Sequence, residues 1–271
     1  MKRPELVVAG GTAVVTGAAG GMGEHIAKGP ARRGADLVVL DRDADGLARV
    51  VADIGRETPG ARVTSHVVDL ADRAAADAVI ARIRDAHPGV TMLFNNAGVA
   101  VGGRFTRVDA EDFDWLLEIN LLVPIRFTRA LLPLMLENGE GRVVNTSSLF
   151  GLVGPPGQSA YCTSKFGLRG FSESLRSELE EEGKPVGVTV VHPGGSGPTS
   201  RSTRGWPVGS TLRRRSATAG PSPRCSASPR TRQPRRSSRP PSPAGPGCSS
   251  ATTPRRSTRW RGSPLRATGR S

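Results

Sequence analysis

The chain alternates short apolar runs with stretches in which apolar residues recur at helical spacing, and this pattern continues to about Gly195. Six of the runs are predicted strands, and most of them are apolar at successive positions, which is typical of strands buried on both faces of a parallel sheet. The predicted strands are Thr12–Thr16, Asp36–Leu40, Arg62–Val68, Val90–Phe94, Arg142–Asn145 and Val186–Val191. The predicted helices are Met22–Arg33, Ala44–Ile54, Asp72–Ala86, Glu111–Leu136 and Ser159–Glu182.

Strands that alternate with helices of roughly 10–15 residues predict right-handed crossovers that place helices on both faces of the sheet. The expected fold is therefore α/β, a doubly wound parallel sheet of Rossmann type in a single domain. The longest predicted helix is expected to break or kink near Pro124 and Pro133. Pro30 falls inside the first predicted helix and indicates either a kink or an error in the sequence.

The pattern stops at Ser196, and residues 196–271 are expected to form a disordered or non-native tail. This tail holds 17 Arg and lacks Lys, Asp, Glu, Ile, Phe, Tyr, Met, Asn and His. Back-translation of residues 196–211, read one base earlier, gives IRTNIAVDARVARRVD, which has spaced apolar residues and balanced charge. The composition therefore favours a frameshift, with a real basic tail as the alternative. We divide the chain into a catalytic domain, residues 1–195, and the tail, residues 196–271.

The tail also dominates the charge of the chain. The whole sequence carries 38 Lys and Arg against 24 Asp and Glu, for a net charge of +14. Without the 17 Arg of the tail, 21 basic residues face 24 acidic residues, so residues 1–195 are mildly acidic. The tail is suited to non-specific, salt-dependent contact with phosphates at most. A specific nucleic-acid site is therefore not expected.

Cysteine content and apolar runs bear on the compartment. Of three Cys, only Cys162 lies before residue 196, so no disulfide framework is expected. The N-terminus lacks the apolar run of a signal peptide, and no stretch is expected to match the roughly 20 apolar residues of a membrane span. The sequence therefore predicts a cytoplasmic protein without a membrane partner.

A glycine-rich segment, TGAAGGMG at Thr16–Gly23, joins the first predicted strand to the first predicted helix. Such a turn lets the backbone approach a pyrophosphate, which the amide groups of the helix N-terminus then bind. The candidate cofactor-binding residues here are Gly17, Gly21, Met22 and Gly23. The alternative is a glycine turn that only packs the helix on the strand.

Asp41 ends the second predicted strand, 18 residues after Gly23. A carboxylate at that point accepts hydrogen bonds from ribose hydroxyls and repels a 2′-phosphate, which favours NAD over NADP. The neighbouring Arg42 counts against this preference because it would attract the phosphate. Asp41 has the alternative role of N-cap to the next helix.

Tyr161 and Lys165 lie four residues apart in YCTSK, on one face of a predicted helix. A lysine ammonium near a phenol stabilises the phenolate, so we expect Lys165 to lower the pKa of Tyr161. The phenol then serves as a general acid or base. Ser148 comes 13 residues earlier at the end of the fifth predicted strand, on the edge where open α/β sheets bind ligands.

In order and spacing, these motifs resemble those of the classical short-chain dehydrogenase/reductase family over about residues 8–195. The resemblance rests on TGAAGGMG, NNAG at Asn95–Gly98, Asn120 in EINLL, NTSS at Asn145–Ser148, YCTSK, and HPGG at His192–Gly195. It implies hydride transfer between NAD(P) and a small-molecule secondary alcohol or carbonyl.

The resemblance also implies roles for individual residues. Tyr161 would be the catalytic acid/base, and Lys165 would lower its pKa and hold the nicotinamide ribose. Ser148, rather than Ser147, would bind the substrate oxygen. Asn120 would hold a water that relays protons to Lys165, its alternative being a polar residue that bends the helix. The implied cofactor contacts are Asp69 and Leu70 at the adenine, Asn96, Ala97 and Gly98 at the adenosine ribose, and Pro193 and Gly194 at the nicotinamide.

The sequence departs from the family after Gly194. The family places an apolar residue and then a carboxamide-binding threonine there, whereas this chain reads Ser196-Gly197-Pro198-Thr199. The family's substrate loop, last helix and seventh strand are not recognisable in the tail. We therefore expect a homo-oligomer, either a dimer or a tetramer, only if the native C-terminus is present. The alternative function is a catalytically impaired dinucleotide-binding remnant.

The four histidines show no metal-ligand spacing, and no metal site is expected. His25, His66 and His87 are interpreted as surface or packing residues, and His192 as a structural residue.

Overall fold

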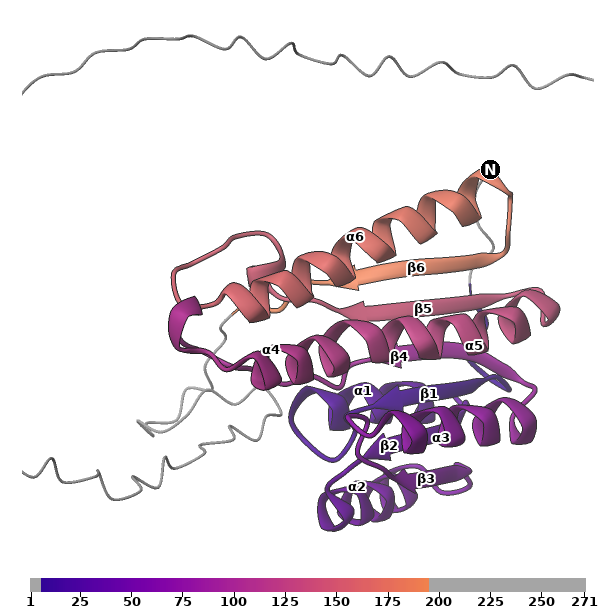
Figure 1. The fold of residues 1–271 in the computed structure, drawn as a ribbon. Coiled ribbons are helices and arrows are strands. Elements are labelled where there is room, and N and C mark those ends of the chain that lie inside the picture. The colour runs from indigo at the N-terminus through magenta and orange to yellow at the C-terminus, as the bar shows by residue number, and fades with distance from the viewer. Residues whose placement is uncertain (1–5, 195–271) are drawn as a thin grey trace, which may run out of the picture. The chain divides into compact units, whose positions relative to one another are not determined.

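Six parallel strands form the sheet at the centre of the computed structural model, which describes residues 6–194 (Figure 1). The strands are β1 (Thr12–Thr16), β2 (Asp36–Asp41), β3 (Val63–Val67), β4 (Val90–Asn95), β5 (Gly141–Thr146) and β6 (Val186–Val191). Their order is β3-β2-β1-β4-β5-β6, so the chain reverses direction across the sheet between β1 and β4. The predicted doubly wound parallel sheet is confirmed.

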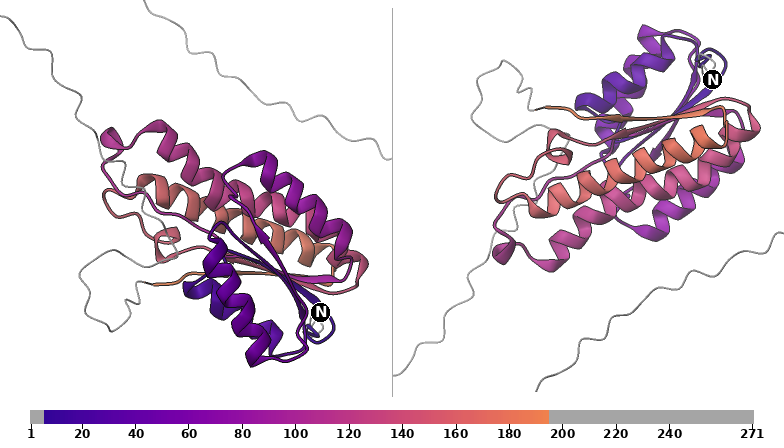
Figure 2. Two further views of the ribbon diagram at one scale, coloured as in Figure 1. Left: turned by 90° about the horizontal axis from the view of Figure 1, so that it is seen from below. Right: turned by 90° about the horizontal axis from the view of Figure 1, so that it is seen from above.

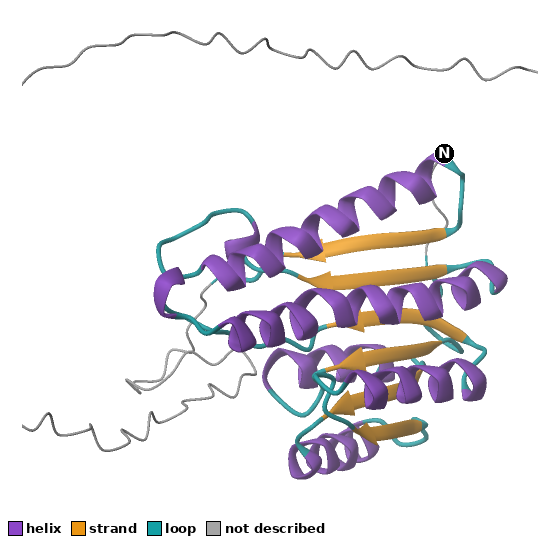
Figure 3. Cartoon of the chain, viewed as in Figure 1, coloured by secondary structure: helices purple, strands orange, loops and turns teal. Residues whose placement is uncertain are grey.

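Helices connect the strands as the crossover pattern predicts (Figure 3). They are α1 (Gly21–Ala31), α2 (Ala44–Glu57), α3 (Arg73–Ala86), α4 (Ala110–Leu117), α5 (Val123–Glu137) and α6 (Ser159–Glu181). Two short 3₁₀ turns, Phe105–Arg107 and Leu149–Gly151, were not predicted. Gly195 and the tail, with the domain boundary placed there, lie outside the described residues.

Alternate strand residues enter two separate cores, one on each face of the sheet. Figure 2 shows the helices that lie on the two faces. On one face, Val14 and Val38 pack with α3, α5 and α6. On the other face, Val15 and Val39 pack with α1 and α2. The two-residue period of a strand explains why these runs are apolar at every position.

The second core ends at β4. Its buried members from the sheet come from β1, β2 and β4, and none comes from β5 or β6. In residues 6–194, α1 and α2 are the helices on this face, and they contact β1, β2 and β3. No described helix therefore covers β5 and β6 on this side (Figure 2).

Pro30 lies in the last turn of α1, which ends one residue later at Ala31. The backbone then continues as a turn, in which Arg33 N–H donates to the carbonyl of Pro30. The missing proline N–H therefore costs one helical hydrogen bond at the helix end, where disruption is least.

The long helical region breaks at a π-helix, Glu118–Leu122, that separates α4 from α5. The expected break near Pro124 is thus confirmed as a change to π-helical hydrogen bonding, which precedes the proline. Pro124 lies in the first turn of α5, and because the π-helix runs directly into α5, the missing N–H of Pro124 removes one hydrogen bond from this helical run. At Pro133, the second position where a break or kink was expected, the helix is not broken, because Pro133 lies within α5.

One helical run, Ala110–Glu137, is long and apolar enough by composition to cross a membrane. Its most apolar 18-residue window has a mean hydropathy of 1.4, so the expectation that no stretch approaches a span is wrong on composition. In the structure, 44% of that window is buried, and α5 packs on β4 and β5. Packing against the sheet therefore explains the apolar residues in the buried part of this window.

Candidate active site at the carboxyl edge of the sheet

The predicted catalytic residues meet where the strands end. Ser148 follows β5, Tyr161 and Lys165 lie in the first two turns of α6, and Asn120 lies in the π-helix. The glycine-rich loop follows β1 at the same edge of the parallel sheet. This is the edge at which open α/β sheets bind ligands, beside the reversal between β1 and β4.

The Tyr161 side chain lies near enough to the Ser148 side chain for Ser148 to lower its pKa. Its ring also packs edge-to-face on Phe150, with centroids 6.2 Å apart. Burial raises the pKa of Tyr161, and the interaction with Ser148 opposes this by favouring the phenolate. In this structure the balance is upward, so the expectation that the pKa of Tyr161 is lowered is not met.

Lys165 is completely enclosed, and its amine donates to the Thr146 carbonyl at 2.9 Å. Lys165 Nζ lies over the Tyr161 ring, 5.7 Å from the ring centroid. Burial lowers the pKa of Lys165 from 10.5 to about 8, because the ammonium loses its hydration. The i,i+4 spacing thus brings the two side chains together, but burial controls both pKa values.

The two serines that follow β5 have different surroundings. The Ser147 hydroxyl is buried and donates to the Lys165 carbonyl at 2.9 Å, which holds α6 on the sheet. Ser148 is half-buried and faces Tyr161, and its oxygen accepts from Phe150 N–H at 3.2 Å. His192 Nδ1 lies 3.0 Å from the Ser148 carbonyl, which fits a structural role for this histidine.

Asn120 is completely buried and holds the segment after β4. Its Oδ1 accepts from Val99 N–H and its Nδ2 donates to the Val99 carbonyl, both at 2.8 Å. Nδ2 also donates to the Ser164 hydroxyl at 3.2 Å. The π-helix presents the side chain at this point, and such turns recur at functional sites.

The glycine-rich loop is packed too tightly for side chains at two positions. A Cβ on Gly23 would lie 1.9 Å from the carbonyl oxygen of Gly17, and a Cβ on Gly17 would lie 2.7 Å from Cα of Ala97. Gly17 and Gly21 also adopt positive φ angles, 68° and 55°. Gly17, Gly21 and Gly23 therefore permit the close approach of α1 to β1 and to the loop after β4.

Asn96 and Thr16 join the glycine-rich loop to the loop after β4. Asn96 Nδ2 donates to the carbonyls of Thr16 and Gly17 at 3.2 and 3.1 Å. The Thr16 hydroxyl oxygen accepts from the N–H groups of Asn96 and Ala97, both at 3.1 Å. This role of Thr16 was not predicted. Its position directly before Gly17 is the sequence feature that could have indicated it.

The Asp41 carboxylate at the end of β2 contacts two backbone amides. One oxygen accepts from Ala19 N–H at 2.9 Å and the other from Asp43 N–H at 3.1 Å. The alternative role of helix N-cap is wrong, because Asp43 is the N-cap of α2 and accepts from Gly46 N–H. Asp41 thus joins β2 to the glycine-rich loop.

The remaining predicted cofactor contacts occupy different surroundings. Met22 is exposed at the start of α1, and Asp69 accepts from Ala71 N–H at 2.9 Å. The Leu70 side chain is 6% exposed and belongs to the core, so it faces the protein interior. The Pro193 carbonyl accepts from Leu149 N–H at 3.0 Å, and Gly194 is exposed.

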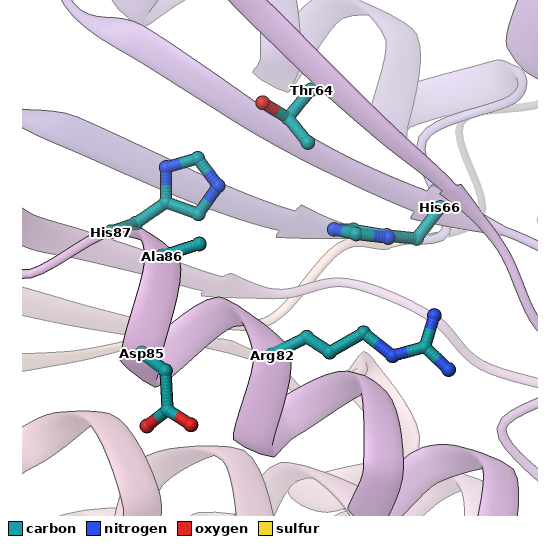
Figure 4. A pocket seen from close by; sticks show the side chains of 6 residues that line it. All are labelled: Thr64, His66, Arg82, Asp85, Ala86 and His87. Atoms are coloured by element: carbon teal, nitrogen blue, oxygen red, sulfur yellow. The ribbon is translucent and has the colours of Figure 1, made fainter.

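A surface hollow between β3 and the end of α3 lies apart from these residues (Figure 4). It is lined by Thr64, His66, Arg82, Asp85, Ala86 and His87. His66 Nε2 is buried there without a hydrogen-bond partner, and burial lowers the pKa of His66. Within residues 6–194, no three His, Cys, Asp or Glu side chains are grouped to hold a metal ion.

Comparison with known proteins identifies the family. Residues 11–204 match the family model of the short chain dehydrogenases. The chain belongs to the short-chain dehydrogenase family. As a member, it is an NAD(P)-dependent oxidoreductase, and the resemblance predicted from its motifs is confirmed.

Relatives of this short-chain dehydrogenase match it over about two thirds of their length. SadH of Mycobacterium tuberculosis is 40% identical over 190 residues, which cover 69% of this chain and 67% of SadH. The oxidoreductase UcpA of Salmonella typhimurium is 37% identical over 186 residues, covering 68% of this chain and 69% of UcpA.

Two similar crystal structures contain nicotinamide dinucleotides. A short-chain dehydrogenase/reductase from Burkholderia phymatum, in complex with NAD, has a TM-score of 0.66 and 32% identity, covering 70% of this chain and 67% of that one. A metagenomic short-chain oxidoreductase, in complex with NADP, has a TM-score of 0.64 and 35% identity, covering 70% of this chain and 84% of that one.

The residues of this short-chain dehydrogenase fit a dinucleotide. Gly20 precedes α1 without a side-chain cap, so the first amide groups of α1 have no capping oxygen. A Cβ on Gly20 would meet nothing within 4 Å, so the space beside this residue is open. Asn96 Oδ1 is buried beside this loop without a partner. Such a helix N-terminus suits a pyrophosphate.

Proposed function

We propose that this chain interconverts a secondary alcohol and a carbonyl with NAD, and that Tyr161 is the catalytic acid/base. The observation that carries the proposal is the grouping of Tyr161 with Lys165 Nζ, 5.7 Å from its ring centroid, and with Ser148, which acts on its pKa, at the carboxyl edge of the sheet. The bound dinucleotide supplies or accepts the hydride. The protein must then place the substrate oxygen and move one proton.

Ser148 and Tyr161 are the two hydroxyl groups available to one substrate oxygen. In carbonyl reduction, Tyr161 donates its proton to the forming alkoxide, and in alcohol oxidation it accepts the hydroxyl proton. Because burial raises the pKa of Tyr161, the neutral phenol is the dominant form in this structure and suits the acid role. Phenolate formation depends on the interaction with Ser148 and the positive charge of Lys165.

The test is turnover by the full-length chain over a panel of secondary alcohols with NAD and ketones with NADH, followed at the NADH absorbance. Tyr161→Phe removes the proton and leaves the ring, so we expect turnover to fall by about 10²–10⁴-fold. Dinucleotide binding, measured by NADH fluorescence, is expected to persist. Thr163→Ala is the control, since Thr163 is exposed on the same helix and donates only to the Ser159 carbonyl. Full activity of Tyr161→Phe would overturn the assignment.

Asp41 supports a preference for NAD. Its carboxylate lies beside the glycine-rich loop and bears a negative charge that repels a 2′-phosphate. Asp41→Ser is therefore expected to improve the use of NADP relative to NAD by about tenfold, measured as the ratio of kcat/KM values. An unchanged ratio would mean that Asp41 does not select the cofactor.

A second candidate is a dinucleotide-binding protein with impaired catalysis. The family match ends at residue 204, and the match to SadH covers 67% of that protein. Within residues 6–194, no helix covers β5 and β6 on the α1 side. This candidate predicts NADH binding without turnover of any substrate. We place either form in the cytoplasm, acting on a small molecule, with a homo-oligomer for the catalytic form.

A further inference from the structure

The backbone of Ala19, in the middle of the glycine-rich loop, is held at both its N–H and its carbonyl, which belong to two successive peptide units. Its N–H donates to Asp41 Oδ2 at 2.9 Å, and its carbonyl accepts from Arg49 Nη2 at 3.0 Å. Asp41 ends β2, whereas Arg49 lies in the second turn of α2. Two elements that follow the loop in sequence therefore fix the two peptide units that meet at the Ala19 Cα.

Arg49 is itself oriented by two carboxylates. Its Nη1 lies 3.1 Å from Glu24 Oε2 in the first turn of α1 and 3.7 Å from Asp53 Oδ2 in α2. Glu24 also pairs with Lys28 at 3.0 Å, which holds its side chain in place. The guanidinium thus joins the loop, α1 and α2. It does so with several donors in one fixed plane, an arrangement that a lysine ammonium cannot reproduce.

The approach of α2 to the loop is close at Gly46. A Cβ on Gly46 would lie 3.0 Å from the Ala19 carbonyl oxygen and 2.5 Å from Asp43 Oδ2. The start of α2 therefore leaves space in which the Ala19 carbonyl turns towards Arg49. The contact with Arg49 thus holds the Ala19–Gly20 peptide, and the contact with Asp41 holds the Ala18–Ala19 peptide on the other side of the same Cα.

We propose that Arg49 is a positioning residue for dinucleotide selection, which acts by holding the backbone of Ala19 in place so that the N–H on the other side of the Ala19 Cα fixes the Asp41 carboxylate. The inference rests on the proposed function, in which Asp41 favours NAD. When Arg49 is lost, the Ala19–Gly20 peptide is free to rotate, the backbone at Ala19 is less restrained, and the Ala19 N–H becomes a less fixed donor to the Asp41 carboxylate. Binding of NADH then weakens, and the exclusion of a 2′-phosphate weakens with it.

A purely stabilising role does not account for this arrangement. The Arg49 side chain is 53% exposed, and exposed ion pairs contribute little to folding. Arg56 provides a matched comparison, because it lies in the same helix, is 77% exposed, and pairs with the same Asp53 carboxylate. Among its contacts in the described residues, Arg56 has none with the glycine-rich loop.

The test measures dissociation constants of the full-length chain for NADH and NADPH by nucleotide fluorescence. Arg49→Met is expected to raise the constant for NADH about fivefold, the factor that corresponds to roughly 1 kcal/mol for one hydrogen bond. The constant for NADPH is expected to stay the same or fall, so the preference for NADH decreases. Arg49→Lys keeps the charge near Glu24 and should recover part of the loss. Arg56→Met should leave both constants unchanged.

Three results would overturn the proposal. Equal NADH binding by Arg49→Met and Arg56→Met would show that the Ala19 contact has no effect on the nucleotide. A larger loss for NADPH than for NADH would mean that Arg49 contacts the 2′-phosphate directly. If the wild-type chain bound neither nucleotide, the proposed function would fail together with the role of Arg49. The first two results, in contrast, would overturn only the role of Arg49.

Discussion

Asn120 and Lys165 approach each other across Gly98. A Cβ on Gly98 would lie 3.3 Å from Asn120 Oδ1 and 3.5 Å from Lys165 Nζ. The missing side chain therefore keeps open the space between the amide oxygen and the amine. This is the space in which the family resemblance places a proton-relaying water.

Gly98→Ala tests the need for that space. The new methyl group would crowd Asn120 Oδ1, which is tied to Val99, so we expect turnover to fall by about tenfold while the protein still folds. Gly55→Ala is the control, because a Cβ at Gly55 in α2 would meet nothing within 4 Å. That change should stabilise the helix by about 1 kcal/mol and leave turnover unaltered. Undiminished turnover in Gly98→Ala would show that the space is not used.

Lys165→Met is expected to stabilise the fold while removing activity. The pKa of Lys165 is about 8 in the folded chain, below its ordinary 10.5, so burial penalises the charged form. Below pH 8 the amine is charged in both the folded and the unfolded states, and this cost is present in full. Above pH 8 the folded state releases its proton first, so wild-type stability rises with pH up to about 10.5.

Urea unfolding at pH 7 and pH 9.5 measures this effect. At pH 7, Lys165→Met should be more stable by on the order of 1–3 kcal/mol, after loss of the donor to the Thr146 carbonyl. The advantage should shrink at pH 9.5, because the wild-type amine is then largely neutral. The prediction would be contradicted if the wild-type chain were more stable than Lys165→Met by the same amount at pH 7 and at pH 9.5.

A buried polar chain that connects β4, β5 and α6 predicts a stability effect away from the catalytic groups. Asn95 Nδ2 donates to Asn145 Oδ1, and Asn145 Nδ2 donates to the Ser172 hydroxyl, both at 2.7 Å. Asn145→Ala leaves both partners without their contact and creates a small cavity, at a cost of about 2–4 kcal/mol. Urea unfolding against Ser177→Ala, an exposed serine of α6, measures it. A loss no greater than in that control would show that the chain of amides is not needed.

The reading frame of the gene is a separate prediction. The 17 Arg of residues 196–271, and the nine residue types absent there, favour translation out of frame. Resequencing across the codons for residues 192–211 should find one base inserted or missing, and the mass of the expressed protein checks the result. A confirmed frame would favour the dinucleotide-binding protein with impaired catalysis.

The sequence predicts the strands well because each strand is marked by a local run of apolar residues. β1 and β6 match their predicted bounds, since their apolar runs end at residues that cannot continue a buried strand. The π-helix at 118–122 has no such local signal. Its position depends on the contact of Asn120 with Val99, which lies 21 residues away in sequence.

The site was predictable as a set of residues but not in its electrostatics. The spacing of Tyr161 and Lys165 predicts that they share a helix face, and Nζ lies 5.7 Å from the ring centroid. The direction of the Tyr161 pKa was wrong because burial is a property of the tertiary structure. Arg49 was missed for the same reason, since its charged position in α2 resembles an ordinary solvent-facing residue.

The π-helix at 118–122 makes the site sensitive to chain length as well as to residue type. It carries one more residue per turn than an α-helix would, and each helical residue corresponds to about 100° of rotation. Deleting a single residue here would restore a regular helix while keeping every catalytic side chain in the sequence. Asn120 would then turn away from Val99, so relatives that keep all the motifs but are one residue shorter in this segment would have a differently arranged site.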